Sequence, residues 1–262
     1  YKAGLLPPNA KLADLTGGFG VDTFFFAKNA VQVVYCEQND GLAEIVRHNV
    51  SILGAENIRI ESGDGITFLQ NQPDDQFNCL YIDPSRRIAS RRVFRLEDCE
   101  PNVVYHVPLL LQKAGRVLIK SAPVLDITAA INVLQATSQV HIVSVDNECK
   151  ELLFVLDRGY SGTPRLIAAM LQDGTVRTFP FTVTEERIAE ARYTQPKTYL
   201  YEPDAALLKA GAFKLIAQRY GLEKLHVNTH LYTSENLYSD FMGRRFLVDK
   251  TMSYSDFKKL HT

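Results

Sequence analysis

The sequence lacks the features that would place it in a membrane or make it a general nucleic-acid binder. It has no apolar run of about 18 residues, the length that a membrane-spanning helix needs, and no signal-peptide pattern. Its net charge is only −1 at pH 7, so any electrostatic binding of nucleic acid must come from local clusters of charge. These absences lead us to expect a cytoplasmic protein.

Cysteine is scarce, and the four cysteines include no C-x-x-C pair. Cys36 and Cys79 lie within apolar strand patterns, which indicates buried thiols in a reducing compartment. His226 and His230 have the i, i+4 spacing of metal ligands but no cysteine or acidic third ligand nearby, so we expect no metal site. The chain opens on Tyr1 rather than Met, and we expect further sequence upstream.

What is present is a regular alternation of strand and helix patterns up to residue 157. Such alternation predicts right-handed βαβ crossovers and a mainly parallel, doubly wound α/β sheet. The short segment 146–150 separates the last two strands, so we expect a closing hairpin that puts one antiparallel strand at the sheet edge. The expected strands are 12–15, 31–36, 58–61, 77–82, 115–119, 140–145 and 152–156, and the expected helices are 21–29, 40–53, 65–71, 102–112 and 124–137.

The first of these units, Lys11 to Thr23, runs from a strand through a glycine-rich turn into a helix. Gly17, Gly18 and Gly20 suit a turn that needs positive φ or a close approach of its backbone to a ligand. Strand, glycine-rich turn and helix form the opening unit of a nucleotide-binding sheet. The alternative is an ordinary turn whose glycines serve geometry alone.

Two acids narrow the choice of ligand. Asp14 ends the first strand, and Glu37 ends the second, where an acid about 20 residues beyond the turn can hold the ribose hydroxyls of an adenosine. A dinucleotide site would prefer G-x-G-x-x-G/A, whereas the segment from Gly18 to Thr23 ends in threonine. An acid directly before the glycines suits a cationic ligand better than a pyrophosphate.

Further polar residues follow the third and fourth strands. Asp64 can accept a hydrogen bond from an adenine amine, cap the next helix, or do both. Asp83, Pro84 and Ser85 follow the fourth strand, which we expect beside the first at the switch point where open α/β sheets bind ligands. The carboxylate and the adjacent carbonyl of this stiff turn can accept two hydrogens from an amine and fix the direction of its lone pair. The alternative is a turn with an N-capping aspartate.

A cluster of arginines comes directly after this turn. Such a cluster beside a site can grip phosphates and position a polynucleotide. The alternative is a solvated loop whose arginines pair with Glu97, Asp98 and Glu100. The five arginines are Arg86, Arg87, Arg91, Arg92 and Arg95.

The composition changes in the last third of the chain. A β-hairpin around Asp173-Gly174 and a polar helical connector lead to a second module. We expect one helix over 204–220 as its core, stopped by Gly221. Tyrosines mixed with cations there are typical of single-strand binders and equally of an interdomain contact. We expect a first domain over 1–158, a hairpin and connector over 159–195, and the second module over 196–262.

Three segments resemble known motifs. Asp14-Leu-Thr-Gly-Gly-Phe-Gly20 resembles the first motif of class I S-adenosylmethionine (SAM) dependent methyltransferases. Asp83-Pro-Ser-Arg86 resembles the D/N-P-P-Y motif of amino methyltransferases acting on nucleobases and the D-P-P-R variants among RNA methyltransferases. The segment departs from the D/N-P-P-Y motif in its third residue, where serine replaces the second proline, and in its fourth, where arginine replaces the stacking aromatic. Tyr199 to Gly211 resembles the THUMP-like module attached to some bacterial SAM-dependent methyltransferases.

The resemblance covers nearly the whole chain. It implies a seven-stranded Rossmann-like methyltransferase sheet with a smaller α+β C-terminal module, SAM as cofactor, and tRNA or rRNA as substrate. The expected cofactor-binding residues are Asp14, Thr16, Gly17, Gly18, Gly20, Glu37, Gln38, Asp64 and Gly65. The expected catalytic residues are Asp83, Pro84 and Ser85, and the expected substrate-binding residues are Arg86, Arg87, Arg91 and Arg92.

We therefore expect a SAM-dependent methyltransferase that modifies an amino or ring nitrogen of an RNA base. Covalent methylation of pyrimidine C5 needs a cysteine nucleophile, and the nearest one, Cys99, lies outside the 83–87 turn. Two alternatives stay open. One is a methyltransferase of a small molecule or protein, and the other is an RNA-binding protein that keeps the fold without turnover.

Overall fold

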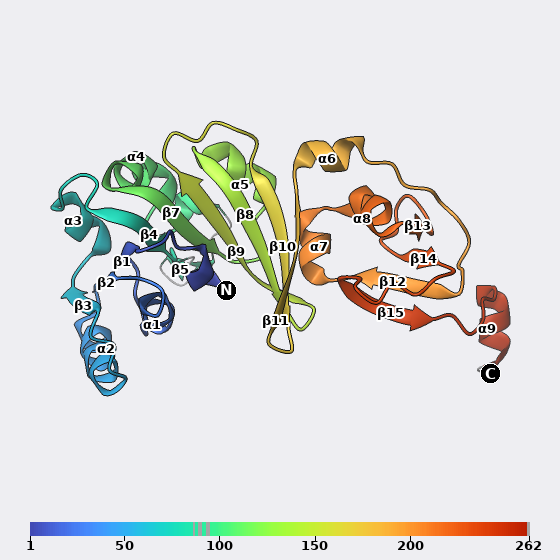
Figure 1. Ribbon diagram of the computed structural model, residues 1–262, viewed down its shortest axis with the longest axis horizontal. Coiled ribbons are helices and arrows are strands. Elements are labelled where there is room, and N and C mark those ends of the chain that lie inside the picture. The colour runs from blue at the N-terminus through green and yellow to red at the C-terminus, as the bar shows by residue number, and fades with distance from the viewer. Residues whose placement is uncertain (86, 89–90, 93–94, 261–262) are drawn as a thin grey trace. The chain divides into compact units, whose positions relative to one another are not determined.

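The computed structural model of the protein describes residues 1–85, 87–88, 91–92 and 95–260. Its contacts divide the chain into two compact units (Figure 1). The first is Tyr1–His141 with Glu151–Pro164, and the second is Ile142–Lys150 with Arg165–Thr262. The strands β8 (Thr137–Val145) and β9 (Glu148–Asp157) therefore contribute residues to both units. The expected domains over 1–158, 159–195 and 196–262 stay a prediction.

The first unit is built on strands that run in the order β3-β2-β1-β4-β7-β9-β8. In the described part of the chain the same sheet continues beyond β8 with β10 (Arg165–Gln172) and β11 (Thr175–Phe181), so it has nine strands where the resemblance implied seven. Neighbouring strands from β3 to β7 are parallel. The chain adds β2 and β3 on one side of β1 and β4 on the other, so the strand order reverses between β1 and β4, at the predicted switch point. The bounds are β1 Lys11–Asp14, β2 Gln32–Glu37, β3 Ile58–Ser62, β4 Phe77–Ile82 and β7 Ala114–Ser121.

The antiparallel strand lies inside this sheet, so its predicted edge position is wrong. β9 pairs antiparallel with β7 and separates it from β8. After β7 the chain forms β8 with one strand position left open between them. The hairpin then places β9 in that position, between β7 and β8. Asp146 and Asn147 form the hairpin turn with φ of 50° and 63°, the left-handed conformation that such two-residue turns require.

Polar side chains set where most helices of the first unit begin. Asn39, Asp64, Asn102 and Asp126 each accept a hydrogen bond from a backbone N–H in the first turn of a helix, which satisfies a donor that the helix leaves unpaired. These caps explain why the predicted helices form, although the last is shorter than expected. The bounds are α1 Val21–Ala27, α2 Asp40–Ile52, α3 Gly65–Gln70, α4 Val103–Lys113 and α5 Ile127–Val133.

The core of the first unit lies between the central strands and the helices α1 and α2. Leu12 and Tyr81 belong to it, and the Tyr81 ring meets Phe26 edge-to-face at 4.8 Å between centroids. Cys36 and Cys79 are fully buried, as predicted. Burial raises the pKa of both thiols, that of Cys79 to about 12.

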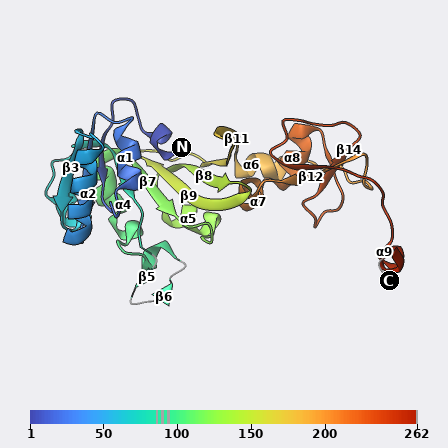
Figure 2. The ribbon, with the colours of Figure 1, turned by 90° about the horizontal axis from the view of Figure 1, so that it is seen from below.

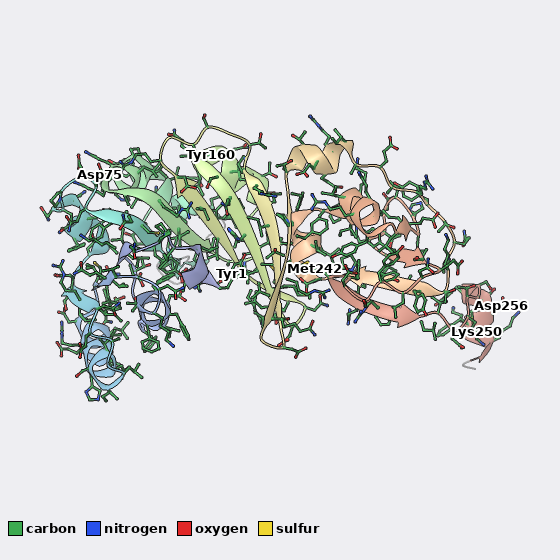
Figure 3. The ribbon with its side chains drawn as sticks, in the orientation of Figure 1. Tyr1, Asp75, Tyr160, Met242, Lys250 and Asp256 are labelled. Atoms are coloured by element: carbon green, nitrogen blue, oxygen red, sulfur yellow. The ribbon has the colours of Figure 1, made fainter. Side chains whose placement is uncertain are left out.

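The N-terminal segment is fastened to this unit through its first two side chains. The hydroxyl of Tyr1, a residue labelled in Figure 3, is hydrogen-bonded to His141 Nδ1 at 2.7 Å. Lys2, the first residue of the 3₁₀ helix η1 (Lys2–Leu5), forms ion pairs with Asp22 at 2.8 Å and Glu151 at 2.9 Å. These contacts bring the start of the chain to α1 and β9.

The second unit begins with the predicted hairpin of β10 (Arg165–Gln172) and β11 (Thr175–Phe181). Its turn residues Asp173 and Gly174 both have positive φ. The helix α6 (Val183–Ile188) follows and starts with a capping box, in which Thr182 and Glu185 satisfy each other's backbone N–H groups.

A separate antiparallel sheet with strand order β13-β14-β12-β15 completes the second unit. Its helical core is not the single predicted helix, because Gly211 adopts φ of 80° and ends α7 before α8 begins. Gly221 ends α8 with φ of 64°, as predicted. None of the helices in the described part of the chain combines the length and apolarity needed to cross a membrane. The bounds are β12 Tyr199–Pro203, α7 Ala205–Ala210, α8 Phe213–Tyr220, β13 Glu223–Lys224, β14 Tyr232–Ser234, β15 Gly243–Leu247 and α9 Tyr254–Leu260.

Candidate functional site

The glycine turn lies at the carboxyl end of β1, between the ends of β2 and β4. Leu15 N–H donates to the carbonyl of Tyr81 on β4 at 3.0 Å, and Gly17 N–H donates to the carbonyl of Cys36 on β2 at 2.8 Å. The two neighbouring strands therefore hold the turn from both sides. This is the edge at which open α/β sheets bind their ligands.

Each of the three positions in the turn holds a glycine for a different physical reason. A Cβ at Gly17 would lie 2.1 Å from the Tyr35 ring, and one at Gly20 would lie 2.7 Å from Val46. Gly18 has φ of 53°, and the nearest heavy atom to its Cβ position is 4.0 Å away. Internal packing thus accounts for Gly17, and packing together with a left-handed φ of 72° accounts for Gly20, whereas Gly18 presents a left-handed backbone with space around it.

Asp14 lies beneath the turn and is only 1% exposed. Its Oδ1 accepts from the backbone N–H of Thr16 at 3.1 Å, and its Oδ2 accepts from the Thr23 hydroxyl at 2.6 Å. Burial raises the pKa of Asp14 to about 7, and these two hydrogen bonds oppose the rise. The Asp14 side chain therefore links the turn, through Thr16, to α1, through Thr23.

A cavity of about 210 Å³ opens beside the turn. It gathers seven of the predicted site residues, whereas Asp14, Gly17, Gly18, Gly20 and Pro84 are not among its lining residues. Four carboxylates line it, and none of its described lining residues is a lysine or arginine, so the cavity favours a cationic ligand. The lining residues are Leu15, Thr16, Cys36, Glu37, Gln38, Asp64, Gly65, Ile66, Asp83, Ser85, Glu100 and Pro101.

Glu37 supports the turn as well as lining the cavity. Its Oε2 accepts from Gly18 N–H at 2.9 Å, and its Oε1 accepts from Asn39 N–H at 2.8 Å. Each carboxylate oxygen has a second lone pair, so the side chain keeps acceptor capacity for a ligand hydroxyl.

Asp64 is the N-cap of α3, one of the two roles expected for it. Its Oδ1 accepts from both the backbone N–H and the hydroxyl of Thr67 at 2.7 Å. A Cβ at Gly65 would lie 2.2 Å from the carbonyl oxygen of Leu15, so the absence of a side chain lets the start of α3 pack against the turn. Asp64 thereby lies at the cavity with Oδ2 outside the capping bonds.

Asp83 is held from two directions. Its backbone N–H donates to the Thr16 hydroxyl at 2.7 Å, and its Oδ2 accepts a hydrogen bond from Lys120 Nζ. Sequence reasoning missed Lys120, which lies near the carboxyl end of β7. A usable signal was present, since a single cation there follows the apolar run Val117–Ile119 in the strand next to β4.

The arginine-rich segment leaves the cavity and returns to it. Ser85 and Glu100 exchange backbone hydrogen bonds of 2.7 and 3.0 Å at its base, and both residues line the cavity. Between them, β5 (Arg87–Ile88) pairs with β6 (Arg91–Arg92), and Figure 2 shows these two strands projecting from the first unit. Arg86 lies outside the described residues, as do the side chains of Arg87, Arg91 and Arg92.

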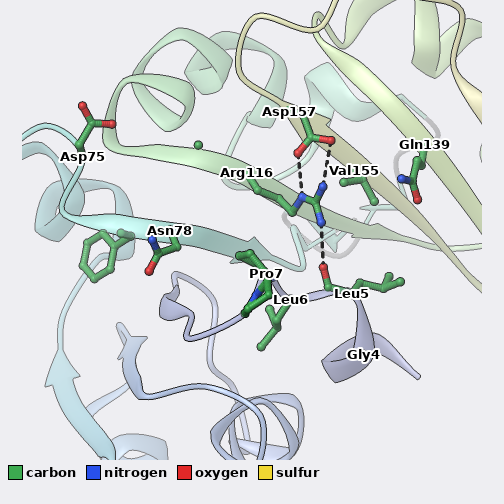
Figure 4. Close-up of a pocket in the computed structure, with 13 residues that line it drawn as sticks. Gly4, Leu5, Leu6, Pro7, Asp75, Asn78, Arg116, Gln139, Val155 and Asp157 are labelled. Carbon is green, nitrogen blue, oxygen red and sulfur yellow. Dashed lines mark hydrogen bonds and ion pairs between the residues drawn. The ribbon is translucent and has the colours of Figure 1, made fainter.

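A larger cavity of about 740 Å³ lies at the amino ends of the strands, where β4 and β7 begin (Figure 4). There the Arg116 guanidinium forms two hydrogen bonds with the Asp157 carboxylate, at 2.7 and 3.1 Å, and a third with the Leu5 carbonyl at 3.1 Å. Burial raises the pKa of Asp157, but the bonds from Arg116 and Ser138 outweigh it and hold that pKa below its ordinary value. These groups fasten the N-terminal segment, and the amino ends of the strands are not where such sheets bind ligands.

The histidines considered as metal ligands have other contacts. His226 Nδ1 accepts from Asn228 N–H at 3.1 Å, and the His230 ring stacks on Phe213 at 3.8 Å between centroids. Across the described residues, no group of three or more His, Cys, Asp or Glu side chains has an arrangement that could hold a metal ion.

Known proteins share this architecture. Residues 199–241 match a family of ferredoxin-like domains. The chain is 36% identical, with a TM-score of 0.90, to a crystal structure from Porphyromonas gingivalis W83 named a "putative methyltransferase", and the match covers 100% of this chain and 66% of that one. It is also 25% identical over 214 residues to a curated protein found in two strains of Mycobacterium tuberculosis. That protein is named an uncharacterized S-adenosylmethionine-dependent methyltransferase, and the match covers 81% of this chain and 55% of the relative.

The chain thus spans a little over half the length of the curated relatives and 66% of the solved one. Within that span, both the strand order with its switch point and the antiparallel domain at residues 199–241 agree with the architecture expected from the motifs. The chain has the Rossmann-like fold of the class I SAM-dependent methyltransferases, followed by a ferredoxin-like α+β domain.

Proposed function

We propose that the protein transfers the methyl group of SAM to a nitrogen atom of an RNA base, with tRNA or rRNA as the substrate. The observation that carries the proposal is that Asp83 opens onto the same cavity as Glu37 and Asp64. A group suited to holding an amine and groups suited to holding an adenosine therefore share one site.

The acidic character of the cavity supports SAM as the cofactor. SAM carries an ammonium and a sulfonium cation, which lining carboxylates favour over an anionic dinucleotide. Glu37 and Gln38 would bind the ribose, and Asp64, beside Gly65, would bind the adenine amine. When bound, SAM supplies a methyl group activated by the sulfonium. The turn over Asp14, from Thr16 to Gly20, would cradle the methionine part.

The Asp83 turn would hold the nucleophile. Its carboxylate would accept one hydrogen of the target nitrogen and the Pro84 carbonyl a second, with Ser85 at the cavity rim. Methyl transfer is an in-line displacement, so alignment of the nitrogen lone pair is the main contribution that these residues can make. Cys99 is buried, and its thiol donates to the carbonyl of Arg95 at 3.3 Å. This burial favours methylation of nitrogen over the covalent route to pyrimidine C5.

Two features support RNA as the substrate. The segment with Arg86, Arg87, Arg91 and Arg92 begins and ends at the cavity rim, where guanidinium groups can contact phosphates close to a bound base. The ferredoxin-like domain would act as a THUMP-like module that binds the same RNA. In this reading the protein works in the cytoplasm on tRNA or rRNA.

The test uses isotopically labelled SAM with in-vitro-transcribed tRNAs and rRNA, which carry no modifications. After digestion to nucleosides, mass spectrometry should locate the label on a base nitrogen. Asp83→Ala should lower turnover by about two to four decades, because it removes a contact made mainly with the reacting group. The affinity for SAM, measured by calorimetry, should stay nearly intact.

Other outcomes would contradict the proposal. A label on pyrimidine C5 or on a ribose oxygen, or full activity of Asp83→Ala, would refute the assigned chemistry. Tight SAM binding without label on any RNA would favour a small-molecule or protein substrate. RNA binding without SAM binding would favour a non-catalytic RNA-binding protein.

A further inference from the structure

Lys120 contacts the side chain that we place at the reacting nitrogen. It lies on β7, and the register pairs Ile82 of β4 with Ile119 of β7, directly before Lys120. The Lys120 ammonium donates to Asp83 Oδ2, with side-chain exposures of 26% and 39% for the two residues. The pair is therefore built by two adjacent strands at the carboxyl edge of the sheet.

This contact distinguishes the two oxygens of Asp83. The Thr16 hydroxyl fixes its backbone N–H, and Lys120 binds Oδ2. Oδ1 lies outside these two contacts, and we assign it to a hydrogen of the target amine. Lys120 is not among the lining residues of the cavity, so any effect that it has on a substrate passes through Asp83.

The other charged residues that line the cavity, among those that the structure describes, are acidic. Asp14 on β1 is close enough that repulsion from Asp83 is one of the causes, after burial, of its raised pKa. Glu100 lies at the base of the arginine segment, and Glu37 and Asp64 lie on the other walls of the cavity. These carboxylates repel that of Asp83, whereas the Lys120 ammonium in direct contact attracts it. The ion pair therefore sets the orientation of the Asp83 carboxylate at the cavity.

We propose that Lys120 is a positioning residue, which fixes the Asp83 carboxylate and directs Oδ1 at the nucleophile. This inference rests on the proposed methyl transfer and adds a residue to it. Lys120 donates a hydrogen bond to Asp83 and would act on the substrate only through that carboxylate.

The first test compares three variants of the full chain. Lys120→Met should lower kcat by about ten- to a hundredfold, while KM for RNA and the Kd for SAM stay within about twofold, since the lost interaction acts on the reacting group. Lys120→Arg keeps a cation and should recover most of the activity. Lys113→Met is the matched control. Lys113 lies directly before the first residue of β7, far along the strand from Lys120, and pairs with Asp74 at 2.9 Å. The control should keep the unaltered kcat.

The second test needs no turnover. In protein labelled with ¹³C at the aspartate carboxyls, Asp83→Asn identifies the Asp83 resonance. At fixed pH, the chemical shift of this resonance should differ between Lys120→Met and the unaltered protein, because the contact with the ammonium is lost, and should not change in Lys113→Met. An unchanged chemical shift or full kcat in Lys120→Met, or an equal loss in Lys113→Met, would overturn the role of Lys120. If the unaltered protein methylates no RNA, the proposed function fails, and the carboxyl chemical shift alone decides the role of Lys120.

Discussion

The hydroxyl of Thr16 accepts a hydrogen bond of 2.7 Å from the backbone N–H of Asp83. This bond crosses the switch point and joins the glycine turn after β1 to the exit of β4. A change on the cofactor side of the cavity therefore reaches the residue that we expect to hold the nucleophile.

The first prediction concerns this bond. Thr16→Val removes the hydroxyl and leaves the part-buried Asp83 N–H without its acceptor, which costs about 1 kcal/mol, the lower end of the range for a buried donor. We expect a lower free energy of unfolding in urea and a lower kcat. Thr16→Ser keeps the hydroxyl and is the control that should behave like the unaltered protein. Equal stability of the valine and serine variants would show that the bond contributes nothing.

The second prediction separates the three glycines of the turn by their surroundings. Gly17→Ala and Gly20→Ala would drive a Cβ into Tyr35 and Val46, at 2.1 and 2.7 Å. Gly18→Ala meets no such contact and has only the cost of a left-handed backbone, about 1–2 kcal/mol. Thermal unfolding should therefore rank Gly18→Ala as the mildest of the three. Loss of SAM affinity in a folded Gly18→Val variant would then point to a blocked ligand. If Gly18→Ala were the most damaging, the packing account of Gly17 and Gly20 would be wrong.

Local signals in the sequence predict much of this fold. The capping residues Asn39, Asp64 and Asn102 act within one helical turn of their partners, so the helix starts are readable from short segments. The switch point between β1 and β4 is expected from the doubly wound topology that the alternation of strands and helices indicates, and it is observed.

The features that sequence reasoning missed depend on contacts between distant segments. The place of β9 is set by the gap that β8 leaves, which no local pattern records. Gly211 interrupts a run whose apolar spacing continues on both sides, so the pattern over 204–220 resembles one helix. The pairing of Lys120 with Asp83 depends on the register of β7 against β4, and the strand patterns alone leave that register open.

The third prediction is a pH dependence of stability. Burial raises the pKa of Asp14 from 3.8 to about 7 in the folded protein. Because the folded state binds this proton more tightly, the contribution of Asp14 to stability is fully present below pH 3.8 and is lost as the pH rises through about 7. Asp14→Asn removes the titration, so its free energy of unfolding relative to the unaltered protein should rise between these two values. Urea unfolding at pH 5 and pH 8 measures this difference, with exposed Asp40→Asn as the control. Parallel pH profiles for the Asp14 variant and the unaltered protein would contradict the prediction.

The last prediction tests whether the arginine segment binds phosphates. Each phosphate contact contributes about −0.9 to the slope of log affinity against log salt on a duplex, and about −0.7 on a single strand. Arg91→Ala with Arg92→Ala should therefore flatten this slope for RNA by roughly one to two units, while SAM affinity is unchanged. The matched control is Arg47→Ala with Arg59→Ala, which removes the same charge from exposed arginines of the first unit that pair with Glu44 and Glu61. A flatter slope in both double variants would reflect net charge rather than contact. An unchanged slope in the Arg91→Ala, Arg92→Ala variant would instead indicate that these arginines pair with the acids at 97, 98 and 100. The segment would then supply no phosphate contact beside the cavity.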